Sequence, residues 1–294
     1  MHGSKIPWVK VNGFLTPDIP PHVAIDIDRA WLALKALRVG ALGAFWTFDW
    51  DTTPTDWWHV ICDDAAYDLD RIPSAKVRWT IRASLARTEV RRVERDWLAD
   101  HGYDLYLRAA GRYGGHQPRT RDGYQDTVLK TRVHPGDLPW EFWGVFTPDD
   151  RLVASANLRL QGECAVLSSA TFDPDARGVY PMNALYYSTV RHYLRERGFR
   201  YVASGSRPIL HETHVEDFRL KMGWRTCYSR LGALVLPPIG ACVSAYHLLR
   251  PAVIRVLPRI PRGKDALRYA DGMVELRRIA AACAVPNREP RTGA

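Results

Sequence analysis

Apolar and polar positions follow two different periods along the chain, and the changes of period mark the predicted elements. An apolar run at 165–171 predicts a strand, and a turn rich in Asp, Gly and Pro follows at 173–181. Residues 182–197 carry apolar side chains at helical spacing, and Gly198 ends this helix. Residues 199–203 predict a second strand. Because parallel strands need such a crossover, the stretch predicts a strand–loop–helix–strand unit.

Further predicted elements flank this unit. Two apolar-rich runs predict strands at 140–146 and 152–160, joined as a hairpin with its turn at 147–150. After the unit, a helix is expected at about 212–222, ending at Gly223. A last strand is expected at 224–235. The order of these elements indicates an α/β fold with a mixed sheet.

The first half of the chain repeats this kind of order less regularly. Residues 1–22 form a lead punctuated by Pro and Gly, and 109–134 is polar and reads as a loop over a site or a connector.

Beyond Pro238 the pattern predicts helices at 241–257, interrupted at Pro251, and at 265–284. The remaining predictions are a helix at 25–39, strands at 41–48, 57–62 and 103–107, and a long basic helix within 68–92.

The composition is that of a globular protein with a basic surface. The 294 residues are 46% hydrophobic and 25% charged, which is enough to bury a sizeable core. The formal net charge is +9, and a basic balance favours an anionic partner such as nucleic acid, a membrane surface or a phosphorylated cofactor. A generally arginine-rich proteome is the alternative explanation.

Cysteine use and apolar segments indicate a cytoplasmic location. The five cysteines form no C-x-x-C pair, so reduced and mostly buried thiols are expected. Residues 1–22 contain no apolar core of a secretory signal. The stretch 231–249 is apolar but contains Pro237 and Pro238, which argues against a membrane span. A peripheral membrane contact through 231–261 stays open.

Three segments resemble the GNAT superfamily of N-acetyltransferases, and within it the FemAB-like branch that includes many bacterial proteins. They are Pro181–Gly198, Ser204–Arg207 and Phe218–Trp224. The likeness covers about 140–238 and extends more weakly over 57–113. It implies a GNAT-like acyl-CoA N-acyltransferase fold in two tandem domains. The domains are a degenerate one at 1–135, a catalytic one at 136–238, and a helical extension with a disordered tail at 239–294.

The resemblance implies a cofactor loop at the start of the central helix. A helix N-terminus offers unpaired amides and a positive dipole end to a pyrophosphate. In the family pattern R/Q-x-x-G-x-G/A, Gly178 fills the first glycine position, whereas Asp175 and Tyr180 depart from it. The implied cofactor-binding residues are Arg177, Gly178, Val179, Tyr180 and Asn183. No tightly bound cofactor is expected; the co-substrate is acyl-coenzyme A or, as in Fem-type relatives, aminoacyl-tRNA.

A second polar cluster follows the predicted strand end at 201–203, where ligands bind in open α/β sheets. Aminolysis needs a base, for which His211, Glu212 and His214 are candidates, and an oxyanion donor, for which Arg207 is a candidate. Helix capping and solvent exposure explain the same residues equally well. The two histidines lack a third metal ligand, so no metal site is expected. The predicted substrate-binding residues are Arg78, Arg82, Ser206, Thr213, Lys221 and Tyr228.

Three residues, two arginines and a glutamate, have competing explanations. Arg78 and Arg82 lie one helical turn apart and suit an anion, but they also fit a solvated cationic helix face. Glu163 lies where some GNAT enzymes carry a general base, but its neighbour Gly162 favours a hairpin turn.

The sequence therefore predicts an acyltransferase that joins an acyl group to a small-molecule or peptide amine by direct attack. The leading donor is an acyl-coenzyme A thioester, and the alternative is an aminoacyl-tRNA. A third hypothesis is a non-catalytic binding module or membrane-associated module with a degenerate GNAT fold. No DNA partner is expected.

Overall fold

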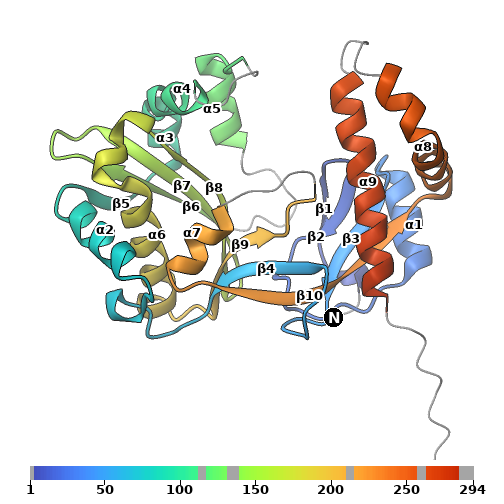
Figure 1. The fold of residues 1–294 in the computed structure, drawn as a ribbon, viewed down its shortest axis with the longest axis horizontal. Helices are drawn as coiled ribbons and strands as arrows, with labels where there is room; N and C mark the ends of the chain where they lie inside the picture. Colours follow the sequence, from blue (N-terminus) through green and yellow to red (C-terminus); the bar gives the residue numbers. More distant parts are fainter. Residues whose placement is uncertain (1–2, 112–116, 131–138, 210–214, 257–262, 285–294) are drawn as a thin grey trace, which may run out of the picture. The chain divides into compact units, whose positions relative to one another are not determined.

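The computed structural model describes residues 3–111, 117–130, 139–209, 215–256 and 263–284 (Figure 1). The chain divides into two compact units. Unit 1 comprises residues 1–59, 206–213 and 227–294, and unit 2 comprises residues 60–205 and 214–226. These limits differ from the predicted domains 1–135, 136–238 and 239–294. The boundary near 135 lies outside the described residues, and the division into sequence domains stays a prediction.

The described chain contains both strands and helices. The strands are β1 (Trp8–Val11), β2 (Phe14–Pro17), β3 (Gly43–Phe48), β4 (Trp57–Cys62), β5 (Glu89–Val93), β6 (Trp140–Phe146), β7 (Leu152–Gln161), β8 (Cys164–Phe172), β9 (Tyr201–Ser206) and β10 (Arg225–Val235). The α-helices are α1 (Arg29–Arg38), α2 (Ala75–Leu85), α3 (Arg95–His101), α4 (Tyr103–Ala110), α5 (Arg121–Lys130), α6 (Pro181–Arg191), α7 (Val215–Lys221), α8 (Pro237–Val256) and α9 (Gly263–Cys283). Short helical turns are η1 (Gly3–Lys5), η2 (Leu69–Arg71), η3 (Pro174–Val179) and η4 (His192–Glu196).

Unit 1 begins with a hairpin inside the segment predicted as an irregular lead. Strands β1 and β2 are antiparallel, and their two-residue turn is Asn12–Gly13, with φ of 49° and 82°. Asn-Gly is the favoured pair for a turn that needs positive φ at both positions. Strand β2 then pairs in parallel with β3, and β10 pairs antiparallel with the other edge of β3.

The core of unit 1 lies on both faces of β3. Helix α1 buries Leu32 and Ala36 in one cluster together with Trp46. Helix α9 buries Leu276 and Ile279 in a second cluster, against which Phe45 packs. Since neighbouring residues of a strand point to opposite faces, Phe45 and Trp46 assign the two helices to opposite faces of β3.

Unit 2 contains an antiparallel meander followed by a parallel pair. Strands β5 to β8 pair in sequence order, each antiparallel to the next, and β9 pairs in parallel with β8. The crossover between β8 and β9 is the predicted loop and helix, now η3, α6 and the π-helical turn η4. The fold class predicted from the sequence, α/β with mixed strand directions, is confirmed.

Helices cover two faces of this meander (Figure 1). Helices α3 and α4 pack Leu98 and Leu105 against Phe142 of β6. On the opposite face, Trp143 of the same strand donates its indole N–H to Tyr193 Oη at 3.1 Å, at the end of the α6 crossover. Helix α2 packs against α6. The predicted apolar face of α6, which includes Leu185 and Val190, is buried.

Several predicted elements are corrected by the structure. The predicted strand at 103–107 is helix α4, because Leu105 and Ala109, four residues apart, are both buried. The long basic helix predicted within 68–92 is shorter: α2 ends at Leu85, and Glu89–Val93 forms strand β5. The polar stretch at 109–134 contains helix α5.

The C-terminal helices follow the prediction with one difference. Helix α8 runs through Pro251 rather than breaking there, and α9 matches the predicted 265–284 within two residues. In the described part of the chain, no helix combines the length and apolar character that a membrane crossing requires.

Candidate functional site

The parallel strands of unit 2 separate part-way along their length. The registered pairs between β8 and β9 end at Val166 and Ala203. Beyond this point β8 continues beside β7 as far as Phe172. The carboxyl ends of parallel strands are where α/β sheets bind ligands. This end of β8, together with the start of α6, is therefore the candidate site in unit 2.

A buried aspartate shapes the segment between β8 and α6. Asp173 is fully buried, and its Oδ2 lies 2.8 Å from Arg108 Nε and 3.0 Å from Arg151 Nη1. Its Oδ1 accepts a hydrogen bond from the amide of Asp175 at 3.0 Å and so caps η3. Because the two arginines neutralise a buried charge, this aspartate fixes the path of the chain into α6.

The chain makes a left-handed turn at the start of α6, and hydrogen bonds to α2 hold this turn in place. Tyr180 is left-handed, with φ of 52° and ψ of 47°, and Pro181 begins the helix. The Tyr180 carbonyl accepts hydrogen bonds from Ser84 Oγ at 3.1 Å and from the Asn183 amide at 2.9 Å. The Asn183 side chain donates to Thr80 Oγ1 at 3.0 Å.

This conformation leaves few free amides for a coenzyme A pyrophosphate. Such a group needs several free amides in succession, and η3 is a 3₁₀ helix whose amides bond internally. The Tyr180 amide donates to the Arg177 carbonyl at 3.1 Å, and Pro181 has no N–H. A Cβ built on Gly178 would meet no protein atom within 4 Å, so no contact within the described protein requires a glycine there.

Cationic and aromatic side chains lie instead on α2, just after it, and on η3, which ends at Tyr180. We call this set the α2 patch and define it as Trp79, Arg82, Arg87 and Arg177. The Trp79 indole is 58% exposed, and its ring centroid lies 5.9 Å from that of Tyr180. Arg87 Nη1 lies 3.5 Å from the Gly178 carbonyl. Arg82 is one turn beyond Trp79 on α2, and Arg177 is exposed on η3. Among the described residues, these arginines have no carboxylate partner.

The structure separates the predicted substrate residues. Arg78 is turned away from Arg82, because its Nη1 donates to the carbonyls of Ile72 at 2.6 Å and Pro73 at 3.2 Å. Lys221 is exposed at the end of α7, beside Ser74 and Asp217. Tyr228 is half-buried in β10 of unit 1. The assignment of these residues to a substrate stays a prediction.

The predicted catalytic cluster is described only in part. His211, Glu212, Thr213 and His214 lie outside the described residues, and their roles stay predictions. Ser206 is exposed at the end of β9. Arg207 Nη2 lies 3.1 Å from Glu275 Oε1. Its guanidinium carbon lies 5.0 Å from the Trp58 ring centroid, so this arginine is held inside unit 1.

Two tyrosines of the α6 crossover hold their protons more tightly than a free phenol, and Glu163 lies in a turn. Burial, reinforced by a hydrogen bond to Asp68, raises the pKa of Tyr187 to about 12. Burial and a hydrogen bond to Glu141 raise the pKa of Tyr193 further. Glu163 forms the β7–β8 turn with Gly162 and pairs with Arg200, as the turn interpretation predicted. The described residues contain no group of His, Cys, Asp and Glu arranged to hold a metal.

Sequence reasoning missed Trp79. The predicted site residues do not include it, although it lies between Arg78 and Arg82 in the sequence. A tryptophan among arginines is a signal for binding a flat or anionic ligand, and the structure adds that this ring is exposed.

No protein-family model and no curated protein matches this chain. Solved structures similar to it include FemX, with 15% identity, a TM-score of 0.48, and coverage of 74% of this chain and 70% of FemX. L-PGS from Bacillus licheniformis has 13% identity, a TM-score of 0.49, and coverage of 79% and 81%. A tandem GNAT protein from the clavulanic acid biosynthesis pathway has 15% identity, a TM-score of 0.44, and coverage of 76% and 75%.

Proposed function

We propose that this protein transfers an aminoacyl group from aminoacyl-tRNA to a small-molecule or peptide amine. The observation that carries the proposal is the α2 patch, which combines an exposed indole with three arginines that have no carboxylate partner among the described residues. The neighbouring segment, whose amides are used internally, favours this donor over a coenzyme A thioester.

The patch suits the single-stranded end of an RNA. Guanidinium groups contact phosphates, and an exposed tryptophan ring stacks on a base of any sequence. The formal charge of +9 adds a long-range attraction for a polyanion. A compact cofactor with a single pyrophosphate would need the amide cradle that η3 and Pro181 do not offer.

The reaction is an aminolysis of an ester. The acceptor nitrogen attacks the aminoacyl carbonyl carbon, the C–O bond to the tRNA ribose breaks, and the ribose oxygen takes up a proton as the amine loses one. We assign the amides of β8 beyond Val166, which are not in register with β9, as donors to the developing oxyanion. The base is expected among His211, Glu212 and His214.

The alternatives make different predictions about binding. An acyl-coenzyme A enzyme would bind acetyl-coenzyme A with little dependence on salt. A non-catalytic or membrane-associated module would bind neither donor and would attach to vesicles through 231–261.

The test is to titrate the protein with aminoacyl-tRNA and with acetyl-coenzyme A at several salt concentrations between 50 and 200 mM, about the range over which phosphate contacts weaken strongly. We expect tRNA binding that falls steeply with salt, and transfer of a labelled amino acid to an added amine. Binding of acetyl-coenzyme A with no tRNA binding would overturn the proposal in favour of the thioester donor. Binding of neither would favour the non-catalytic module.

A further inference from the structure

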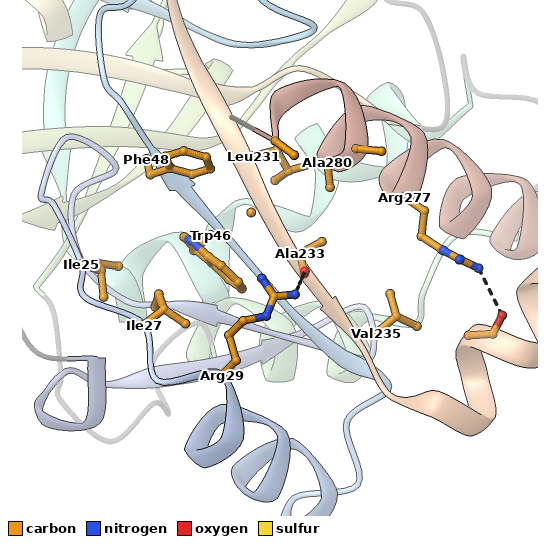
Figure 2. A pocket seen from close by; sticks show the side chains of 14 residues that line it. Ile25, Ile27, Arg29, Trp46, Phe48, Leu231, Ala233, Val235, Arg277 and Ala280 are labelled. Carbon is orange, nitrogen blue, oxygen red and sulfur yellow. Dashed lines mark hydrogen bonds between the residues drawn. The ribbon is translucent and has the colours of Figure 1, made fainter. Parts of the chain in front are cut away.

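Unit 1 contains a cavity that the proposed function does not use. Its volume is about 580 Å³, within the range of small-molecule sites. It lies over β3 and β10, between the residues that precede α1 and the C-terminal part of α9 (Figure 2). The cavity belongs to unit 1 alone, since every residue that lines it is part of that unit.

The walls of the cavity are mostly apolar. Aliphatic side chains from the segment before α1 and from β10 form its sides, and Trp46 and Phe48 of β3 form its floor. Small residues of α9, such as Ala280, leave the space open. A ligand that fills this space would gain by removing an apolar body from water.

A single arginine adds charge at the centre of this apolar wall. The guanidinium carbon of Arg29 lies 5.8 Å from the Trp46 ring centroid, and Nη2 donates to the Ala233 carbonyl at 3.1 Å. Figure 2 shows this side chain reaching across the cavity toward Ala233. Arg29 has only these neutral partners among the described residues, so its remaining donors are available to an anion.

A second arginine stands at the rim. Arg277 also lines the cavity, and its Nη1 donates to the Gly240 carbonyl at 3.1 Å and to Ser244 Oγ at 3.0 Å. In Figure 2 its guanidinium points toward α8 rather than toward Arg29. Its neighbour Arg278, by contrast, is paired with Glu275 and Asp56. The cavity thus offers a primary cation in Arg29 and a weaker one in Arg277.

We infer that this cavity binds a single-chain amphiphile with one anionic head. The chain lies against Trp46 and the aliphatic walls, and the carboxylate or phosphate head receives N–H donors from Arg29. An apolar site with a few placed polar groups is the usual composition of a small-molecule site. The inference does not depend on the proposed transfer reaction.

The test is isothermal titration calorimetry of the full chain with three ten-carbon probes: decanoate, decyl phosphate and decyltrimethylammonium. We expect one decanoate or decyl phosphate per chain and no binding of the cation. Binding of decanoate alone would assign the head to a carboxylate, and binding of decyl phosphate alone would assign it to a phosphate. Failure of both anions, or equal binding of the cation, would overturn the inference.

Substitutions test whether the amphiphile binds in this cavity and whether Arg29 binds its head. Arg29→Gln should weaken decanoate binding about tenfold, the size of a lost charge-assisted hydrogen bond. Arg277→Gln should have a smaller effect, and Arg38→Gln, which removes the same charge from the far end of α1, should have none. Ala280→Phe should fill the cavity and abolish binding, whereas Ala282→Phe, exposed on the same helix and outside the lining, should not. Unchanged binding in Ala280→Phe with an unchanged thermal midpoint would also overturn it.

Discussion

Unit 1 and unit 2 each place an arginine beside a tryptophan, but the burial of the tryptophan differs. Trp46 is 7% exposed and forms the floor of a cavity under Arg29, whereas Trp79 is 58% exposed on the outside of α2. A buried ring contributes apolar wall and leaves the guanidinium as the polar contact. An exposed ring is itself a contact surface, with a face open for stacking. The same two residue types therefore suit a small amphiphile in one unit and a polymer in the other.

The largest expected effect is on stability and comes from substituting Asp173, whose ion-pair partners Arg108 and Arg151 belong to unit 2. Asp173→Ala should lower the free energy of unfolding by about 3 kcal/mol, because it leaves Arg108 and Arg151 without their buried partner and removes the cap of η3. Urea unfolding measures this change. The same variant should weaken tRNA binding and leave decanoate binding as it was.

Asp175→Ala is the matched control, because Asp175 is exposed on the same turn. It should change the free energy of unfolding by less than about 0.5 kcal/mol. Equal destabilisation by both variants would show that η3 is not held by Asp173.

The second effect is a pH dependence of the free energy of unfolding, and it comes from His59 in unit 1. Burial lowers the pKa of His59 from 6.5 to about 3, and its ring lies against Trp50 and Trp57 with Nε2 3.3 Å from Thr47 Oγ1. Between these two pH values the unfolded chain binds a proton that the folded chain does not, so stability falls as the pH falls. The free energy of unfolding should be about 2 kcal/mol lower at pH 5 than at pH 7 from this residue alone.

The variant His59→Asn should flatten this part of the pH profile, measured by urea unfolding at several pH values. His101→Asn is the control in unit 2, because His101 is exposed at the end of α3. An identical slope in the parent and His59→Asn proteins would contradict the assignment.

Substitutions in the α2 patch itself should have a smaller effect, which is on tRNA binding. Trp79→Ala should weaken tRNA binding about tenfold through lost stacking on one base. Arg82→Gln should lower the slope of log affinity against log salt by about 1, the loss of one phosphate contact. Filter binding at several salt concentrations measures both. Arg38→Gln removes an equal charge in unit 1, and a slope change of the same size there would mean that only net charge matters.

The smallest expected effect is on the rate of thiol labelling, and it leaves the free energy of unfolding unchanged. Burial raises the pKa of Cys62 and of Cys164 in unit 2 to about 12, whereas Cys242 is exposed on α8 of unit 1. A thiol reagent should therefore label one equivalent rapidly at pH 8, because thiolate and access are both needed. Cys242→Ser should remove that fast phase. Rapid labelling that persists in this variant would place an accessible thiol elsewhere.

The period of the apolar pattern decided much of the fold. Strands β4 and β6 have the predicted bounds, Trp57–Cys62 and Trp140–Phe146, because a short, mostly apolar run can bury side chains on both faces of a strand. The crossover through α6 followed from helical spacing and Gly198, which has a φ of 66°. These are properties of neighbours along the chain.

The predicted strand at 103–107 is wrong because so short a stretch fits both the period of a strand and the period of a helix. Tyr103, Leu105 and Leu107 at alternate positions suit a strand. The helix instead brings Leu105 and Ala109 into the core and stacks Tyr106 on Tyr124, with ring centroids 5.2 Å apart. Helix α5, which carries Tyr124, lies in a stretch without apolar periodicity. Packing against distant elements decided both helices.

The sequence by itself determined which side chains carry charge, and the tertiary structure decided which charges remain available. Arg78 and Arg82 are equivalent in the sequence, yet Arg78 donates to the carbonyls of Ile72 and Pro73, whereas Arg82 has no carboxylate partner among the described residues. Arg29 meets the carbonyl of Ala233, 204 positions away. A guanidinium takes the nearest acceptor in space, and folding alone sets that distance.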